Sequence, residues 1–159
     1  MRTRPAQGVT LIEVMVAIAI VAVLAAAAVP SFVTTIGRSR LDGAMSTLSV
    51  DLQYTRSEAV RRRSAATLTV AADGASYTVS YTNPVTLAEV NLKTVDMPID
   101  VRLAASAPIS FDSLRGIASA QTLTGTNSRI GAQLQVLTNA TGRVQMCTPN
   151  GSFTGYASC

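Results

Sequence analysis

Glu13 is the one charged side chain in an otherwise apolar stretch near the start of the chain. The sixteen residues 14–29 contain no polar side chain, and residues 9–12 extend the stretch on its other side. Together they supply about the 20 residues that an α-helix needs to cross the hydrocarbon layer of a bilayer. A charge in that layer costs about 2.5 kcal/mol or more on insertion scales, so we expect the carboxylate to have a partner or a function.

The residues around Glu13 resemble a known processing signature. Gly-Val-Thr-Leu-Ile-Glu at 8–13 follows a short basic leader and precedes the long apolar run. This arrangement resembles that of type IV prepilins, although Phe is usual at the position of Val9. The resemblance implies that prepilin peptidase cuts between Gly8 and Val9 and that Val9 is then N-methylated. It also implies that Glu13 and the helix-bending Pro30 serve in assembly.

The spacing of the two predicted charges has a physical consequence. Cleavage after Gly8 would leave a cationic amine on Val9, four residues before Glu13. Residues four apart lie on one face of a helix, and the helix dipole favours an anion near its N-terminus. In a bundle of such helices, Glu13 of one subunit could therefore neutralise the Val9 amine of its neighbour. An unpaired Glu13 in lipid would drive the subunit into an assembly.

A secretory signal peptide is the alternative interpretation of the same segment. Arg2 and Arg4 would then form its basic region. Residues 14–24 would form the apolar region, and the alanines at 25–27 would form the cleavage site. A carboxylate at the head of the apolar region, Glu13, is hard to explain on this interpretation, so the prepilin signature is favoured.

The two cysteines of the chain, Cys147 and Cys159, both lie near its C-terminal end. Downstream of an export helix, such a pair predicts a disulfide formed in an oxidising compartment. In the chain-entropy treatment, a loop of this size stabilises the fold by roughly 3 kcal/mol. With two cysteines, no histidine and no C-x-x-C pattern, no metal site is expected.

The composition argues against an enzyme. The chain has 159 residues, a net charge of +4 and no histidine, so a Ser or Cys nucleophile would lack its usual base. No phosphate-binding glycine loop occurs, and no cofactor is expected. Asp96, Asp100 and Asp112 lie in a turn-rich segment without a recognisable partner, so we expect them to be solvated loop acids. The length fits one domain plus an anchor helix.

A single long helix is predicted over residues 10 to about 63, with a bend near Pro30 and a softer point at Gly37. Glu58 precedes Arg62 by four residues, a favourable surface pair. Beyond the bend, apolar or small residues recur at spacings of three and four, as on one face of an amphipathic helix: Leu41, Met45, Leu48, Leu52, Thr55 and Ala59.

After residue 63 the period of apolar residues changes from 3.6 to 2, which predicts β-structure. The Ser/Gly/Thr-rich stretch 119–128 is expected to be an exposed loop, and 139–142 a turn. Strands are expected at 66–71, 76–82, 87–93, 99–103, 109–111, 132–138 and 143–148. The fold class is therefore α+β: a long N-terminal transmembrane and amphipathic helix packed on a mostly antiparallel, pilin-like β head.

A second segment strengthens the resemblance. Thr55-Arg56-Ser57-Glu58-Ala59 resembles the "Ala-Arg-Ser-Glu-Ala" stretch that precedes the first strand in the GspH/FimT family of minor pilins and pseudopilins. Thr55 stands where Ala is commoner. The implied organisation is a prepilin leader at 1–8, a transmembrane or filament-core half-helix at 9–35, and a periplasmic head at 36–159.

Three consecutive arginines, Arg61, Arg62 and Arg63, close the predicted helix. Cations at a helix C-terminus complement the helix dipole and often remain solvated. The same side chains could also contact the phosphates of a nucleic acid, so both interpretations stay open.

A second basic feature, Gly142-Arg143-Val144-Gln145, enters the last predicted hairpin strand. Some DNA-binding minor pilins of the FimT type carry Gly-Arg-x-Arg at this place, and the resemblance implies contact with the DNA backbone. Gly142 and Arg143 match, whereas Gln145 replaces the second arginine. One charge that would release counterions on phosphate binding is therefore missing.

The resemblance implies a minor pilin that is processed by prepilin peptidase and joins, or primes, a type IV pilus. Its partners would be other major and minor pilins or pseudopilins, with the chain in the inner membrane as a single pass before it enters the filament. Two alternatives stay open. One is a minor pilin that binds double-stranded DNA for uptake in natural transformation, and the other is a minor pseudopilin of a type II secretion system.

Overall fold

The structure is a computed structural model that describes residues 9–149, 151 and 153–159; of residues 27, 28 and 30 it describes only the backbone. The chain divides into two compact units, Met1–Ile36 and Gly37–Cys159. The second unit is called the head below. The predicted leader at 1–8, including the cleavage residue Gly8, lies outside the described residues.

Among the described residues, one helix, α1 (Leu11–Arg62), accounts for the helical part of the chain, as the apolar pattern predicted. It ends where Arg63 adopts a left-handed conformation with a φ of 52°. The Ser64 amide then donates a hydrogen bond of 3.1 Å to the carbonyl of Ala59, which satisfies one of the last free carbonyls of the helix.

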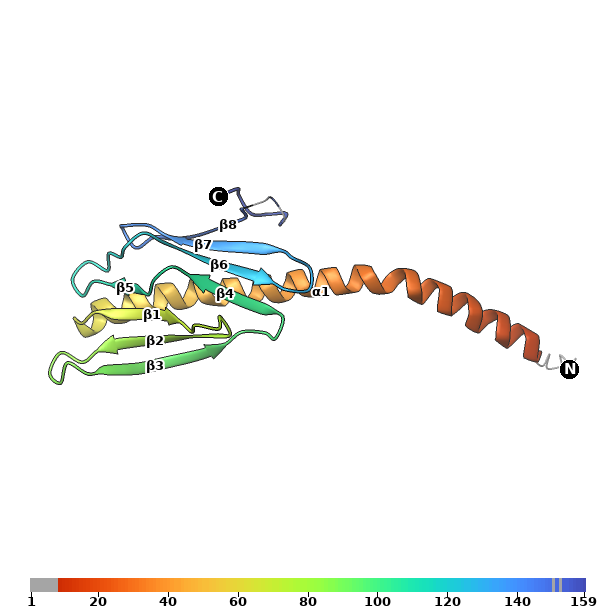
Figure 1. Ribbon diagram of the computed structural model, residues 1–159, viewed down its shortest axis with the longest axis horizontal. Coiled ribbons are helices and arrows are strands. Elements are labelled where there is room, and N and C mark those ends of the chain that lie inside the picture. The colour runs from red at the N-terminus through yellow and green to blue at the C-terminus, as the bar shows by residue number, and fades with distance from the viewer. Residues whose placement is uncertain (1–8, 150, 152) are drawn as a thin grey trace, which may run out of the picture. The chain divides into compact units, whose positions relative to one another are not determined.

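Eight strands follow α1 and form two four-stranded sheets (Figure 1). The first sheet has the order β3-β2-β1-β5 and the second the order β4-β6-β7-β8, and every ladder in both is antiparallel. The strands are β1 (Ala66–Val70), β2 (Ser76–Thr82), β3 (Glu89–Asp96), β4 (Val101–Ala105), β5 (Ile109–Phe111), β6 (Gln121–Asn127), β7 (Gln133–Thr138) and β8 (Val144–Cys147).

The core of the head lies between α1 and the two sheets. All six positions of the predicted helical face are fully buried: Leu41, Met45, Leu48, Leu52, Thr55 and Ala59. They meet apolar side chains from both sheets, such as Leu68 and Tyr77 in the first and Leu123 and Leu134 in the second. The amphipathic half of the helix is thus the common support of both sheets.

The Ser/Gly/Thr-rich stretch 119–128 is not an exposed loop as predicted, because most of it forms strand β6. Leu123, Gly125 and Asn127 alternate on its buried face. A Cβ atom at Gly125 would lie 2.3 Å from the sulfur of Met45, so the absence of a side chain lets β6 run directly over the helix. The small residues mark a close approach of backbone to helix.

Three of the predicted strands are one residue too long at one or both ends, and two others are displaced by two or three residues at each end. The third strand is Glu89–Asp96 instead of 87–93, and the fourth is Val101–Ala105 instead of 99–103. The Asn83 side chain accepts hydrogen bonds from two following backbone amides, which prolongs the turn before β3. Asparagine side chains that bond their own backbone in this way favour turns over strands.

A buried carboxylate ties the first sheet to the helix. Asp51 of α1 accepts hydrogen bonds from the Tyr77 hydroxyl at 2.5 Å and from the Lys93 ammonium at 2.7 and 2.8 Å. Asp51 and Tyr77 are almost fully buried, and burial raises the pKa of the Tyr77 hydroxyl, as does its hydrogen bond to Asp51. Because every polar group here has a partner, burial of the carboxylate is compatible with a stable core.

The predicted disulfide between Cys147 and Cys159 is present. It closes a C-terminal segment whose Phe153 is buried in the core and whose Tyr156 hydroxyl donates a hydrogen bond to Asp42 of α1. The disulfide and these two aromatic side chains together hold the segment on the head.

Reduction of this disulfide is expected to lower the free energy of unfolding of the head by roughly 3 kcal/mol, because the unfolded chain regains the freedom of an open loop. The measurement is thermal unfolding with and without reductant, with mass spectrometry to confirm the gain of two hydrogens. Cys147→Ser with Cys159→Ser should match the reduced protein. Equal unfolding temperatures for the oxidised and reduced forms would contradict the prediction.

Candidate functional sites

The first candidate site is the start of α1. The Glu13 amide donates hydrogen bonds to the Thr10 carbonyl at 3.1 Å and to the Thr10 hydroxyl at 3.4 Å. Thr10 is therefore the N-cap of the helix, and Thr10-Leu11-Ile12-Glu13 has the spacing of a capping box. Sequence reasoning missed this role, although the T-x-x-E pattern before an apolar run was visible.

The carboxylate of Glu13 is available for a partner. The side chain is exposed, and no hydrogen bond or ion pair joins its carboxylate to another described residue. The large apolar side chains around it are exposed as well, with Leu11 at 78% and Val9 and Ile12 at 70%. A continuous apolar surface of this kind is typical of a membrane or protein contact.

Pro30 lies inside α1 at the far end of this apolar segment. Its side chain lies outside the described residues, so its role in bending the helix stays a prediction. By length and composition, no single straight helix in the described part of the chain qualifies as a membrane span. The two parts of α1 on either side of Pro30, Leu11–Ala26 and Ser31–Arg62, qualify only when taken together as a bent pair.

The second candidate site is an open hollow of about 550 Å³ on the head, which is lined by three arginines and no acid. Arg143 comes from the turn before β8, Arg56 from α1 and Arg115 from the turn after β5. Arg143 and Arg115 are exposed, and the Arg56 guanidinium donates a hydrogen bond of 3.4 Å to the carbonyl of Gly142. Guanidinium groups in such a hollow could bind phosphate or carboxylate.

The local structure requires glycine at position 142. Gly142 ends the predicted turn, which is confirmed: the Asn139 side chain accepts hydrogen bonds from the amides of Thr141 and Arg143. The φ of Gly142 is +73°, and a Cβ atom there would lie 2.3 Å from the carbonyl oxygen of Gly116. Packing and backbone conformation therefore require glycine, whether or not the neighbouring arginine binds a ligand.

Gln145 lies with Arg143 at a second hollow, of about 460 Å³. Arg143 is the only charged residue in its lining, which otherwise holds apolar and uncharged polar residues: Ser106, Ala120, Gln121, Thr122, Leu137, Thr138 and Asn139. Arg143 and Gln145 therefore share one surface, as the motif comparison requires, but Gln145 supplies no positive charge.

The three arginines at the helix end are not part of either hollow. Arg61 and Arg62 both bond Glu58, with nitrogen–oxygen distances of 2.6 Å, and the Arg62 guanidinium lies 4.2 Å from the centre of the Tyr81 ring. Glu58 is only 5% exposed, so the predicted surface pair is in fact a buried carboxylate held by two arginines. Arg63 is exposed.

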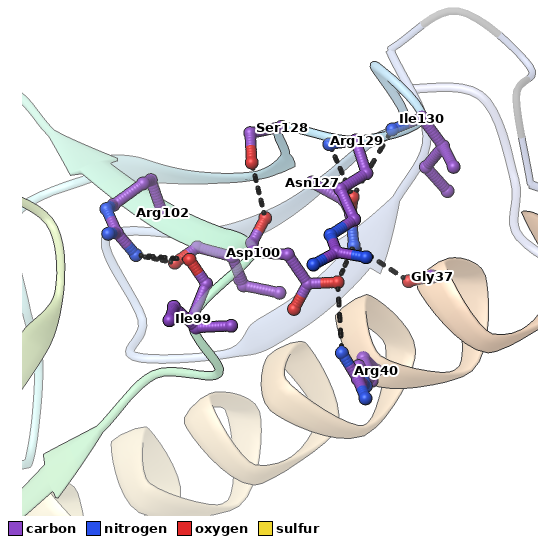
Figure 2. Close-up of polar contacts among 10 residues, drawn as sticks. Gly37, Arg40, Ile99, Asp100, Arg102, Asn127, Ser128, Arg129 and Ile130 are labelled. Carbon is purple, nitrogen blue, oxygen red and sulfur yellow. Dashed lines mark hydrogen bonds and ion pairs between the residues drawn. The ribbon is translucent and has the colours of Figure 1, made fainter. Parts of the chain in front are cut away.

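Asp100 is buried, which corrects the prediction that it is a solvated loop acid. Its carboxylate accepts a hydrogen bond of 3.1 Å from the Asn127 amide and forms an ion pair of 3.5 Å with Arg40 (Figure 2). The same Asn127 amide nitrogen donates to the carbonyl of Gly37 at 3.1 Å. This network joins the turn before β4 and the end of β6 to the first residues of the helix in the head.

The pKa of Asp100 follows from these contacts. Burial by itself would raise the pKa, but the hydrogen bond from Asn127 and the Arg40 guanidinium together lower it below the ordinary value. The hydrogen bond from Arg61 outweighs burial at Glu58 and lowers its pKa too. Such groups stabilise the fold above the pKa of the unfolded chain, and that stability is lost as the pH falls through the lowered folded value.

We therefore expect the unfolding temperature of the protein to fall steeply below about pH 4, where free carboxylates begin to protonate. Asp100→Asn should flatten that decline, because its neutral amide can still accept the Asn127 hydrogen bond. Arg40→Gln, which removes only the ion pair, should flatten it less. Thermal unfolding between pH 7 and pH 2 checks this, and parallel curves for the native chain and Asp100→Asn would contradict it.

Two family profiles match the sequence. Residues 3–29 match the Prokaryotic N-terminal methylation motif. Residues 44–142, more than half of the chain, match the family described as Type II transport protein GspH. The chain belongs to the GspH family. No curated protein matches the sequence of this GspH-family chain.

Two solved structures share the fold of this GspH-family protein. The type IV minor pilin FimU of Pseudomonas aeruginosa is 20% identical, with a TM-score of 0.58 over 73% of this chain and 97% of its own. The minor pseudopilin EpsH from the Type 2 Secretion System of Vibrio cholerae is 12% identical, with a TM-score of 0.60 over 70% of this chain and 98% of its own. At these identities the likeness establishes the fold alone.

These findings confirm two predictions. The chain is a pilin-like protein of the GspH/FimT type, a group of minor pilins and pseudopilins, and its fold is a long N-terminal helix followed by antiparallel sheets. Proteins of this family are structural subunits. Within the described residues of this GspH-family chain, no group of three or more His, Cys, Asp or Glu side chains could hold a metal ion.

Proposed function

We propose that this GspH-family protein is a minor pilin that joins, or primes, a type IV pilus. Prepilin peptidase removes the leader after Gly8, and Val9 is N-methylated. Residues 9–35 then hold the chain in the inner membrane as a single pass, with the head in the periplasm, until assembly. The role is structural, without enzymatic activity.

One observation supports this proposal most directly. Within the methylation motif at 3–29, the exposed apolar residues at the start of α1 carry a single carboxylate, Glu13, that has no partner among the described residues. A cationic amine on Val9 of a neighbouring subunit would neutralise that charge, while contact between helices would cover the apolar surface.

The same features would serve a minor pseudopilin of a type II secretion system, since EpsH is such a protein and has the same fold. Affinity isolation of the tagged chain from its own cells separates the two roles. Co-isolation with pilus subunits supports the minor-pilin role, and co-isolation with pseudopilins supports the alternative.

Processing tests the proposal before any filament is isolated. We expect the chain produced together with prepilin peptidase to begin at Val9 and to carry one extra methyl group, as seen by mass spectrometry of the N-terminal peptide. Without the peptidase the leader should remain. A chain that begins after the alanines at 25–27 would instead reveal a secretory signal peptide and overturn the proposal.

Binding of double-stranded DNA is a second candidate function, in which the pilin would take part in DNA uptake. The observation that favours it is the acid-free hollow, where Arg56 and Arg115 lie with Arg143. Their charges offset the one that Gln145 lacks, so the site does not depend on the Gly-Arg-x-Arg pattern alone. Aromatic side chains for base stacking are missing from its lining, which favours contact with phosphates over contact with bases.

The purified full chain in detergent, titrated with double-stranded DNA across a salt series, tests this candidate. Affinity should fall with salt, and Arg143→Ala should weaken binding and reduce the slope by about one counterion. Arg38→Ala, an exposed arginine outside the hollow, is the matched control and should bind normally. Absence of binding at low salt would exclude the DNA-binding function and leave the structural role intact.

A further inference from the structure

We propose that the end of the head around Ile99 binds the anionic surface of the membrane before the subunit is assembled. The contact consists of Ile99 at the apolar centre, with Arg102, Arg129 and Arg40 beside it, and is called the Ile99 surface below. The partner is a bilayer with negatively charged phospholipid headgroups. The inference rests on the proposed membrane anchor at 9–35.

Ile99 is the apolar part of this surface. It lies in the turn between β3 and β4 and is 81% exposed, one of the most exposed large apolar side chains of the head. The turn is held in place: the Val101 amide donates to the Pro98 carbonyl at 2.8 Å, and the Arg102 guanidinium donates to the Ile99 carbonyl at 3.2 Å (Figure 2). A fixed turn that presents an isoleucine to solvent is suited to insertion at a bilayer interface.

The arginines supply positive charge. The Ser128 amide donates to the Asp100 carbonyl at 2.8 Å, which holds the turn containing Arg129 next to the turn containing Ile99. Arg102 and Arg129 are exposed, and neither forms an ion pair with any described residue.

Asp100 is buried and paired with Arg40, whereas Asp96 and Asp73, which lies in the turn that bonds β4, are exposed. Arg102 and Arg129 form no ion pair with these acids and are the groups that would meet the headgroups. Guanidinium groups bind phosphate in a fixed geometry, and each basic residue near an anionic bilayer contributes about 1 kcal/mol to binding.

Chain length allows this surface to reach the lipid. Residues 11–29 make about 28 Å of helix, which is close to the hydrocarbon thickness of about 30 Å. Gly37 follows eight residues later, so it can lie at most about 12 Å beyond the hydrocarbon boundary in a helix. Because the Asn127 amide bonds both Gly37 and Asp100, the Ile99 turn is tied to that same point of the chain.

The test uses the absence of tryptophan from this chain. Ile99→Trp introduces a single fluorophore into the full chain, which is reconstituted in vesicles of phosphatidylcholine alone or with phosphatidylglycerol, each with brominated acyl chains as quencher. Quenching of the introduced tryptophan should be at least about twofold greater in the anionic vesicles, and Arg102→Gln with Arg129→Gln should remove most of that difference. Val85→Trp is the control, since it lies in the turn at the opposite end of β3 and is 89% exposed.

Quenching at position 99 that is no greater than at position 85, or that does not depend on phosphatidylglycerol, would overturn the proposal and point to another protein as the partner of this surface. Resistance of the chain to carbonate extraction is measured on the same vesicles. Release by carbonate would overturn the anchor itself and this inference with it, whereas a retained chain without quenching would overturn the Ile99 surface alone.

Discussion

Glu13→Ala is expected to be processed and membrane-inserted normally but to be missing from filaments. A carboxylate in hydrocarbon costs about 2.5 kcal/mol or more, and pairing with the Val9 amine of a neighbour would relieve that cost only in an assembly. Without the carboxylate, the driving force is lost and the neighbour's amine remains unpaired. Immunoblots of sheared filaments and of membranes, with mass spectrometry of the N-terminal peptide, measure incorporation and processing separately.

Two further variants separate charge from helix capping. Glu13→Gln keeps the size of the side chain and the position within the capping box, and it should fail to incorporate in the same way as Glu13→Ala. Thr10→Ala removes the hydroxyl that caps the helix but keeps the carboxylate, and it should still incorporate. Normal incorporation of Glu13→Gln would show that charge pairing is not the basis of assembly.

Gly125→Val is expected to destabilise the head by about 3 kcal/mol, at the upper end of the cost of overpacking. Valine is favoured in strands, but that preference spans only about 1 kcal/mol. The added carbons would overlap the sulfur of Met45, and a Cβ atom alone would already lie 3.2 Å from Leu41. Both neighbours are fully buried, so neither has room to move aside. Thermal or urea unfolding measures the change.

Thr126→Val is the matched control for this prediction. It is the next residue of β6, it is not fully buried, and its side chain points to the opposite face of the strand. Strand propensity without overpacking should leave its stability unchanged or slightly raised. If Gly125→Val unfolds at the same temperature as Thr126→Val, the close approach of β6 to the helix is not a packing constraint.

The helix and most strands could be predicted because burial imposes a period on the sequence. Leu41, Met45 and Leu52 recur as one helical face must, and the change to alternation after residue 63 marks the first strand. Strand β6 was missed because its buried positions do not show a regular pattern of large apolar residues. A strand that crosses a helix at contact distance needs a small residue such as Gly125 where the pattern would otherwise show a large apolar one.

Some of the candidate sites could be predicted from the sequence and others could not. Glu13 and the methylation motif are defined by neighbouring residues, so the sequence alone shows them. The burial of Asp100 is not local, because it depends on Asn127 and Arg40, which lie far away in the chain. The grouping of Arg56 and Arg115 with Arg143 likewise depends on how three elements meet, and no spacing rule predicts it.

The most direct test of the assembly proposal is zero-length cross-linking of isolated filaments and membranes with a carbodiimide, which joins a carboxylate only to an amine in contact with it. The account predicts a cross-linked peptide pair that joins Glu13 of this chain to the processed N-terminus of another subunit, and its loss in Glu13→Gln. Filaments that contain the chain but show no such pair, while the Asp51–Lys93 contact inside the head cross-links as an internal positive control, would contradict it.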